Sequence, residues 1–121
     1  MFFKHTRRLD HCGTSINNII NDNNVIGIIT FPDTQITRLE GNQITGNGDN
    51  GIALEATTVE ELLNNTIVNN KGGGIITNGD SSVNARNNII AGNVGGIAFS
   101  LDPLGTLSPN LAYNDIWNNA Q

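Results

Sequence analysis

The stretch NTIVNNKGGGII at residues 65–76 holds one copy of a pattern that recurs along this chain. An asparagine is followed two places later by isoleucine, three places after that by a second asparagine, and then by Gly-Ile. The first asparagines are Asn18, Asn42, Asn65, Asn88 and Asn114, the isoleucines are Ile20, Ile44, Ile67, Ile90 and Ile116, and the second asparagines are Asn23, Asn47, Asn70, Asn93 and Asn119. The first asparagines are 24, 23, 23 and 26 residues apart, which predicts a solenoid whose coils bury one another's apolar side chains.

The composition agrees with a thin core repeated along an axis. Of the 121 residues, 37% are hydrophobic and only 5% are aromatic, which is too little for a broad core between packed layers. Such a low apolar content with 14 glycines would otherwise suggest disorder, but the apolar residues are strictly spaced.

Each repeat holds three short apolar segments, and these predict three strands per coil. The first surrounds the isoleucine series, the second is the Gly-Ile segment at residues 28–30, 52–54, 75–77 and 97–99, and the third is looser. Helix is disfavoured by the asparagine, glycine and β-branched residues. We therefore predict an all-β parallel β-helix of about four to five coils of 22–26 residues, with the isoleucines inside and their neighbours outside.

The asparagines are expected to stack as a structural ladder at the corners. Asparagine tolerates left-handed backbone conformations, and its amide both donates and accepts hydrogen bonds, so identical residues one coil apart can bond to each other. The alternative is that these amides bind sugars. The glycines Gly27, Gly51, Gly74 and Gly96 are expected where a positive φ or a close backbone approach excludes a Cβ atom.

The units at residues 65–76 and 88–99 resemble right-handed parallel β-helix repeats of the pectin-lyase-like superfamily. The stretch YNDIWNN at residues 113–119 is similar to a late coil of its bacterial and archaeal members. The resemblance spans about residues 16–119 and implies a right-handed coil and an extracellular or cell-surface location. That superfamily includes lyases, hydrolases, epimerases and non-catalytic surface proteins, so the resemblance implies a fold and leaves the activity open.

Residues 1–15 are expected to form an N-terminal segment or partial cap, and residues 16–121 the repeats, which stop within a coil. This suggests a fragment of a larger protein. Open coil ends invite pairing, so self-association is expected there.

Charge and hydropathy exclude some partners. The net charge is -5, and no basic stripe is present that would bind nucleic acid. No segment has the length of a membrane span, and the opening residues lack the apolar stretch of a secretory signal. The spacing of His5, His11 and Cys12 matches no common zinc site.

A row of acidic residues is the main candidate for chemistry. The sixth residue after each glycine of Gly-Ile is Asp33, Thr57, Asp80 and Asp102. If Asp80 and Asp102 lie on adjacent coils, they would form turns, hold Ca²⁺ or contact substrate, or act as an acid/base pair. Glu55 neighbours this row. No cofactor other than Ca²⁺ is suggested.

Two further positions bear on function. Trp117 follows the isoleucine of the last coil, so it should point outward, where it would either stack on a sugar or cover the coil end. Arg38 and Glu61 occupy one slot in consecutive coils and predict a surface ion pair. The loop at residues 101–110 would extend any ligand surface.

The sequence therefore suggests a polysaccharide-binding or polysaccharide-associated scaffold. The alternatives are a fragment of a polysaccharide lyase or hydrolase that uses the aspartate row, and a spacer or adhesin stalk without ligand. The sequence does not decide whether the protein is an enzyme.

Overall fold

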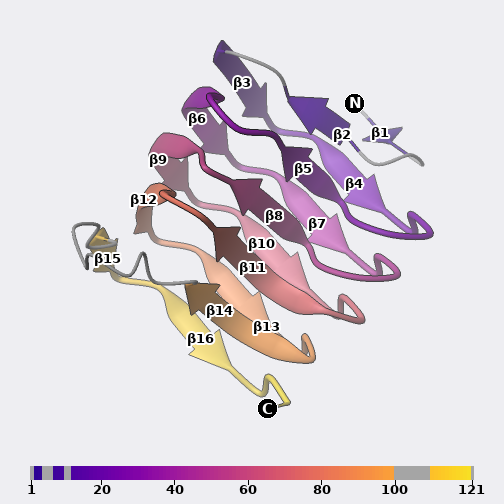
Figure 1. Ribbon diagram of the computed structural model, residues 1–121. Coiled ribbons are helices and arrows are strands. Elements are labelled where there is room, and N and C mark those ends of the chain that lie inside the picture. The colour runs from indigo at the N-terminus through magenta and orange to yellow at the C-terminus, as the bar shows by residue number, and fades with distance from the viewer. Residues whose placement is uncertain (1, 4–6, 10–11, 100–109, 121) are drawn as a thin grey trace.

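The computed structural model describes residues 2–3, 7–9, 12–99 and 110–120. The chain winds into a parallel β-solenoid in which each coil contributes one strand to each of three sheets (Figure 1). The described residues contain strands and turns and no helix. The predicted all-β architecture with three short strands per coil is confirmed.

The sheets contain equivalent strands of successive coils. Sheet A consists of β1 (Phe2–Phe3), β4 (Ile19–Asn21), β7 (Gln43–Thr45), β10 (Thr66–Val68), β13 (Ile89–Ala91) and β16 (Asp115–Trp117). Sheet B consists of β2 (Arg7–Leu9), β5 (Ile28–Thr30), β8 (Ile52–Glu55), β11 (Gly73–Asn78) and β14 (Gly95–Phe99). Sheet C consists of β3 (Cys12–Ile16), β6 (Gln35–Glu40), β9 (Thr58–Leu63), β12 (Ser82–Arg86) and β15 (Asn110–Ala112).

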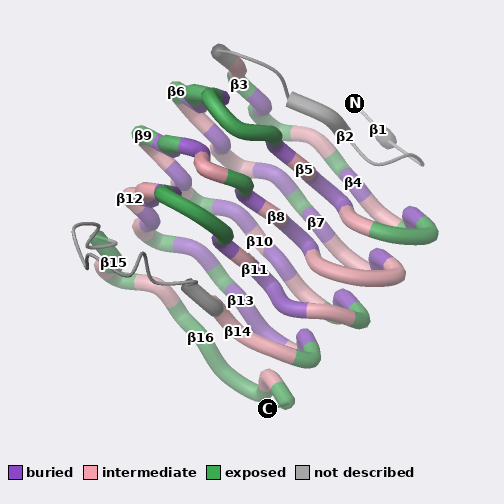
Figure 2. The backbone as a smooth tube through the Cα atoms, in the orientation of Figure 1, coloured by how far each residue is buried: buried purple, intermediate pink, exposed green. Residues whose placement is uncertain are grey.

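The isoleucine series forms a stacked column at the centre of sheet A. Strand pairing aligns Ile20, Ile44, Ile67, Ile90 and Ile116 in one register. The first four are fully buried, whereas Ile116 in the last described coil is 44% exposed. The core continues through the isoleucines of sheet B and the paired Leu39 and Leu62 of sheet C. Buried positions recur at the same place in successive strands (Figure 2).

The predicted asparagine ladder is present at both ends of each sheet A strand. Asn65 is representative: its Oδ1 accepts from the backbone N–H and the Nδ2 of Asn42, both at 3.0 Å. Its Nδ2 donates to Asn88 Oδ1 at 3.0 Å and to the Leu39 carbonyl at 2.9 Å. All four hydrogen-bonding capacities of this buried amide are used, which offsets its desolvation. The second ladder repeats the arrangement from Asn23 to Asn119.

The left-handed backbone that turns each corner belongs to the residue before each ladder asparagine. The residues with positive φ before the first ladder are Asn17, Gly41, Asn64, Asn87 and Tyr113, and those before the second are Asp22, Gly46, Asn69, Gly92 and Asn118. No ladder asparagine has a positive φ. The ladder asparagines therefore hold the corner by hydrogen bonds, while their neighbours supply its backbone geometry.

The glycine of each Gly-Ile pair is required because atoms of the next coil lie where a Cβ atom would be. None of Gly27, Gly51, Gly74 and Gly96 has a positive φ. A Cβ atom on Gly51 would lie 2.6 Å from Ile67 Cγ2 and 2.8 Å from the Gly74 carbonyl oxygen. Of the two expected reasons for glycine here, the steric one is correct.

The first strands of the chain join the sheets. β1, β2 and β3 pair in parallel with β4, β5 and β6 respectively. The cap function of residues 1–15 stays a prediction. Among the described residues, no helix has the length and hydropathy needed to cross a membrane.

Candidate functional site

The corner between sheets B and C does not align the aspartates as expected. Thr58 pairs with Gln35 and with Ser82, so Thr57 lies beside Thr34 and Ser81. These three side chains are buried, and the Thr57 N–H donates to Ser81 Oγ at 3.1 Å. The row that contains Thr57 is therefore a row of hydroxyl groups, and the expected alignment of Asp33 and Asp80 with Thr57 is wrong.

The two described aspartates both directly precede the hydroxyl row, since Asp33 is followed by Thr34 and Asp80 by Ser81. Counting back from the paired Gln35 and Thr58 puts Asp33 beside Ala56, and Asp33, Ala56 and Gly79 all have a left-handed backbone. The two turns differ in their left-handed residue, which is Asp33 itself in one turn and Gly79, the residue before Asp80, in the other. Both aspartates are exposed. Asp102 lies outside the described residues, as does most of the 101–110 loop, so the juxtaposition of Asp80 and Asp102 stays a prediction. Within the described ranges, no three His, Cys, Asp or Glu side chains form a metal-binding group.

Glu55 lies at the exposed end of β8. Its carboxylate accepts from Asn78 Nδ2 on the next coil at 3.5 Å, the limit of a hydrogen bond. Strand pairing places Glu55 beside Asn78. A single carboxylate beside an amide is suited to a polar contact with a ligand rather than to acid/base chemistry.

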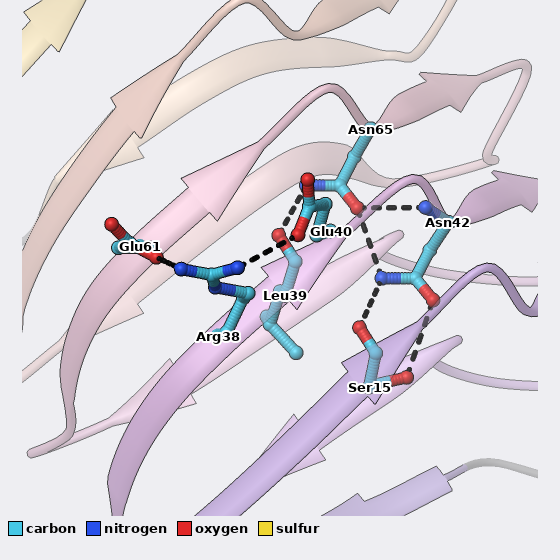
Figure 3. Close-up of polar contacts among 7 residues, drawn as sticks. All are labelled: Ser15, Arg38, Leu39, Glu40, Asn42, Glu61 and Asn65. Atoms are coloured by element: carbon cyan, nitrogen blue, oxygen red, sulfur yellow. Dashed lines mark hydrogen bonds and ion pairs between the residues drawn. The ribbon is translucent and has the colours of Figure 1, made fainter.

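Charged side chains gather on the outer face of sheet C. Arg38 contacts Glu61 on the next strand at 2.5 Å and Glu40 on its own strand at 3.2 Å (Figure 3). The predicted pair of Arg38 and Glu61 is confirmed. The hydrogen bond and charge of Glu61 raise the pKa of the Arg38 guanidinium, with a smaller contribution from Glu40. Gln35 and Glu60 form a further contact at 2.6 Å.

The outer face of sheet A is different because it is almost uncharged. In β4, β7, β10, β13 and β16 the residues on either side of the column isoleucine form two outward rows. One row is Ile19, Gln43, Thr66, Ile89 and Asp115, and the other is Asn21, Thr45, Val68, Ala91 and Trp117. Asp115 is the one charged residue among these ten positions. We call this surface the sheet A face.

Trp117 lies at the last described strand of the sheet A face. Its side chain is 56% exposed, and it pairs with Ala91, which is only 6% exposed. The row therefore runs over small side chains and ends at a large aromatic ring. This agrees with the expected outward position of Trp117.

An open pocket of about 610 Å³ adjoins Trp117. Its lining includes Gly72, Gly73, Gly95, Val94, Ile76 and Trp117. Gly73 and Gly95 are register partners on adjacent strands; Gly73 is buried against the Ile76 side chain, whereas Gly95 is partly exposed and leaves backbone at the pocket surface. A volume of this order lies within the range of small-molecule sites, which is roughly 300–1,000 Å³.

Gly72, Gly73 and Gly95 of this pocket were not singled out in the sequence, whereas Gly96 was. The repeat requires one glycine before its isoleucine, but the chain has three at residues 72–74 and two at residues 95–96. A Cβ atom on Gly95 would meet only Gly73 Cα, at 3.7 Å, and the φ of Gly95 is not positive. The backbone therefore does not require glycine at position 95. The extra glycine before the repeat glycine was the feature of the sequence that could have indicated this pocket.

The comparison with protein families decides the classification. Residues 10–103 match the family model described as "Right handed beta helix region". The chain belongs to the right-handed β-helix family. The match confirms the handedness that the resemblance implied and is consistent with the pectin-lyase-like superfamily. No curated protein and no solved structure matched the chain.

The sheet A face offers uncharged side chains of several kinds. An exposed indole offers an apolar surface and one N–H donor. The face adds the amides of Asn21 and Gln43 and the hydroxyls of Thr45 and Thr66. The face thus combines apolar surface with uncharged hydrogen-bond donors and acceptors.

Proposed function

We propose that this β-helix is a polysaccharide-binding scaffold that holds a glycan chain on the sheet A face, with Trp117 stacked against a sugar ring. The observation that carries the proposal is the outward position of Trp117 in register with an uncharged row of the sheet A face. Parallel strands of one sheet repeat about every 4.8 Å, so a row of equivalent side chains gives a polymer a series of similar contacts.

The charge of the face favours neutral glycans. Asp115 is the one charged residue among the ten outward positions, and the whole chain carries a net charge of -5. A polymer of uronic acids would find no cation on this face, and charges interact over about 8 Å at physiological ionic strength. Neutral hexose or pentose polymers would bind without this repulsion.

The pocket beside Trp117 provides a place for one sugar unit. Gly95 presents backbone at the pocket surface, so a ring can approach closely, while Val94 and Ile76 contribute apolar contacts. The Trp117 ring supplies stacking, which contributes about 0.5–1.5 kcal/mol in aromatic pairs beyond the area buried.

An extracellular or cell-surface location belongs to this proposal, because long polysaccharides are found there. Protease treatment of intact cells should release peptides of this protein. Recovery of its peptides only after cell lysis would contradict the location.

The binding experiment compares three variants with the unchanged chain. Trp117→Ala removes the ring, and Gly95→Leu fills the pocket from a position where the backbone accepts a side chain. Tyr113→Ala is the control, because Tyr113 is an aromatic residue of the same coil, is 88% exposed and does not line the pocket. Affinity electrophoresis against neutral and uronic-acid polysaccharides measures binding.

We expect binding to a neutral polysaccharide that Trp117→Ala and Gly95→Leu weaken roughly tenfold, as the loss of about 1.4 kcal/mol implies. Tyr113→Ala should leave it unchanged. Absence of binding to every glycan would favour a spacer without ligand. Binding that Trp117→Ala does not weaken would place the ligand elsewhere. The catalytic alternative rests on Asp80 and Asp102, and it stays a prediction because Asp102 lies outside the described residues.

A further inference from the structure

The chain contains three Asn-Gly pairs, which differ in burial and in hydrogen bonding. They are Asn47-Gly48, Asn50-Gly51 and Asn78-Gly79. In such a pair the backbone nitrogen of glycine can attack Cγ of the asparagine side chain, because glycine has no Cβ atom to hinder the approach. The reaction requires a glycine N–H that is not held by an acceptor and a side-chain amide that is free to rotate.

The first pair is locked by the second ladder. Asn47 is fully buried, and its Oδ1 accepts from Asn23 Nδ2 at 2.7 Å while its Nδ2 donates to Asn70 Oδ1 at 2.8 Å. The Gly48 N–H donates to the Asn23 carbonyl at 2.8 Å. Both reacting groups are therefore engaged, and the coil must open before Asn47 can react.

The second pair is locked by strand pairing at the corner of sheet B. Asn50 Oδ1 accepts from the Gly73 N–H at 2.7 Å. The Gly51 N–H donates to the Gly73 carbonyl at 2.9 Å, and Gly51 is buried. The attacking nitrogen of this pair is again unavailable while the coil is closed.

The third pair lies in the turn between β11 and β12. Residues 78–80 are all exposed. Asn78 Nδ2 contacts Glu55 at 3.5 Å, the limit of a hydrogen bond, so this amide is held more weakly than those of Asn47 and Asn50. Gly79 has a φ of 61°, which marks a sharp turn. An exposed turn can rotate its peptide groups without opening a coil.

We propose that Asn78 is a site of spontaneous deamidation, and that the fold protects the other two Asn-Gly pairs. The Gly79 nitrogen loses its proton and bonds to Asn78 Cγ, the Cγ–Nδ2 bond breaks, and the nitrogen takes up that proton and leaves as ammonia. Water then opens the five-membered imide at either carbonyl and yields aspartate or isoaspartate.

The product alters the surface beside Glu55. A carboxylate at position 78 replaces the amide that donates to Glu55 across neighbouring strands, so two negative charges then face each other. Isoaspartate would also lengthen the backbone by one methylene group at the end of β11. The modification thus converts a neutral contact between coils into a repulsive one.

Peptide mapping by mass spectrometry tests the proposal. The folded chain and the chain in denaturant are incubated at mildly alkaline pH until the denatured chain has reacted at all three pairs. In the folded chain, residue 78 should convert faster than residues 47 and 50 by roughly tenfold or more, since the latter must first open cooperatively. In denaturant, the three rates should become similar because all three pairs have glycine in the second position.

The Asn78→Gln variant is the control, because its exposed position tolerates the change and a longer side chain forms the ring less readily. The folded variant should release much less ammonia than the folded unchanged chain. Conversion of residue 47 or residue 50 at the rate of residue 78 in the folded chain would overturn the proposal. So would an unreactive residue 78 in the folded chain.

Discussion

Asn65 Nδ2 donates to Asn88 Oδ1 at 3.0 Å across adjacent coils, and both side chains are almost completely buried. Asn65→Asp removes both donors of this amide and buries a carboxylate against the oxygens of Asn88 and Leu39. We expect a loss of roughly 3 kcal/mol or more in the free energy of unfolding, since a buried unpaired acceptor and charge are added together. Urea denaturation followed by circular dichroism measures it.

The adjacent Asn64 provides the matched control. It is exposed and has a φ of 54°, a conformation that aspartate also tolerates. Asn64→Asp should therefore change stability by less than about 0.5 kcal/mol, as is usual for surface positions. Equal losses for the two variants would show that the ladder hydrogen bonds are not the source of stability.

Substitution of the column isoleucines should cost less stability at Ile116 than at Ile67. Ile67 is fully buried, whereas Ile116 in the same column is 44% exposed. Ile67→Ala should cost about 2–5 kcal/mol because it removes buried surface and leaves a cavity. Ile116→Ala should cost clearly less, since much of its side chain already contacts water. Denaturant unfolding of both variants checks the order, and a larger loss for Ile116→Ala would contradict the stacked core.

The fold could be predicted because each repeat states the same information. The spacing of asparagine and isoleucine fixes one register for sheet A, and strand pairing reproduces it from Ile20 to Ile116. Every position of the column is isoleucine, so the column could be recognised in the sequence. The Arg38 and Glu61 pair was visible for the same reason, since both residues lie at fixed distances from the ladder.

The candidate site was less predictable because turns differ in length. Counting from the glycine of Gly-Ile placed Asp33, Thr57 and Asp80 in one row. The turns that contain Asp33 and Asp80 each hold one residue more than the turn at Ala56, so a count of six residues reaches the hydroxyl row at Thr57 but stops one residue before it at Asp33 and Asp80. Gly95 was missed because it directly precedes Gly96, which the repeat requires. In the sequence alone, the two glycines look alike.

Two glycines of equivalent type should respond oppositely to alanine. A Cβ atom on Gly51 would lie 2.6 Å from Ile67 Cγ2, whereas one on Gly95 would meet only Gly73 Cα at 3.7 Å. Gly51→Ala should cost about 1–3 kcal/mol through overpacking. Gly95→Ala should be neutral or stabilise by up to about 1 kcal/mol, because alanine restricts the unfolded chain. Thermal unfolding of both variants provides the test, and destabilisation by Gly95→Ala would mean that its backbone is strained.

The ion pair of Arg38 and Glu61 should favour the correct strand register but add little to the free energy of unfolding. The pKa of Arg38 is raised by Glu61, so folding favours the charged guanidinium. The stability that results is complete below the ordinary pKa of arginine and is lost only as the pH rises through the raised value. Arg38 should therefore add no pH dependence to unfolding near neutrality. A double-mutant cycle of Arg38→Ala and Glu61→Ala should give a small coupling that high salt removes, because the groups are solvent-exposed. A coupling that persists at high salt would mean that the pair is shielded from solvent, contrary to its position on the outer face of sheet C.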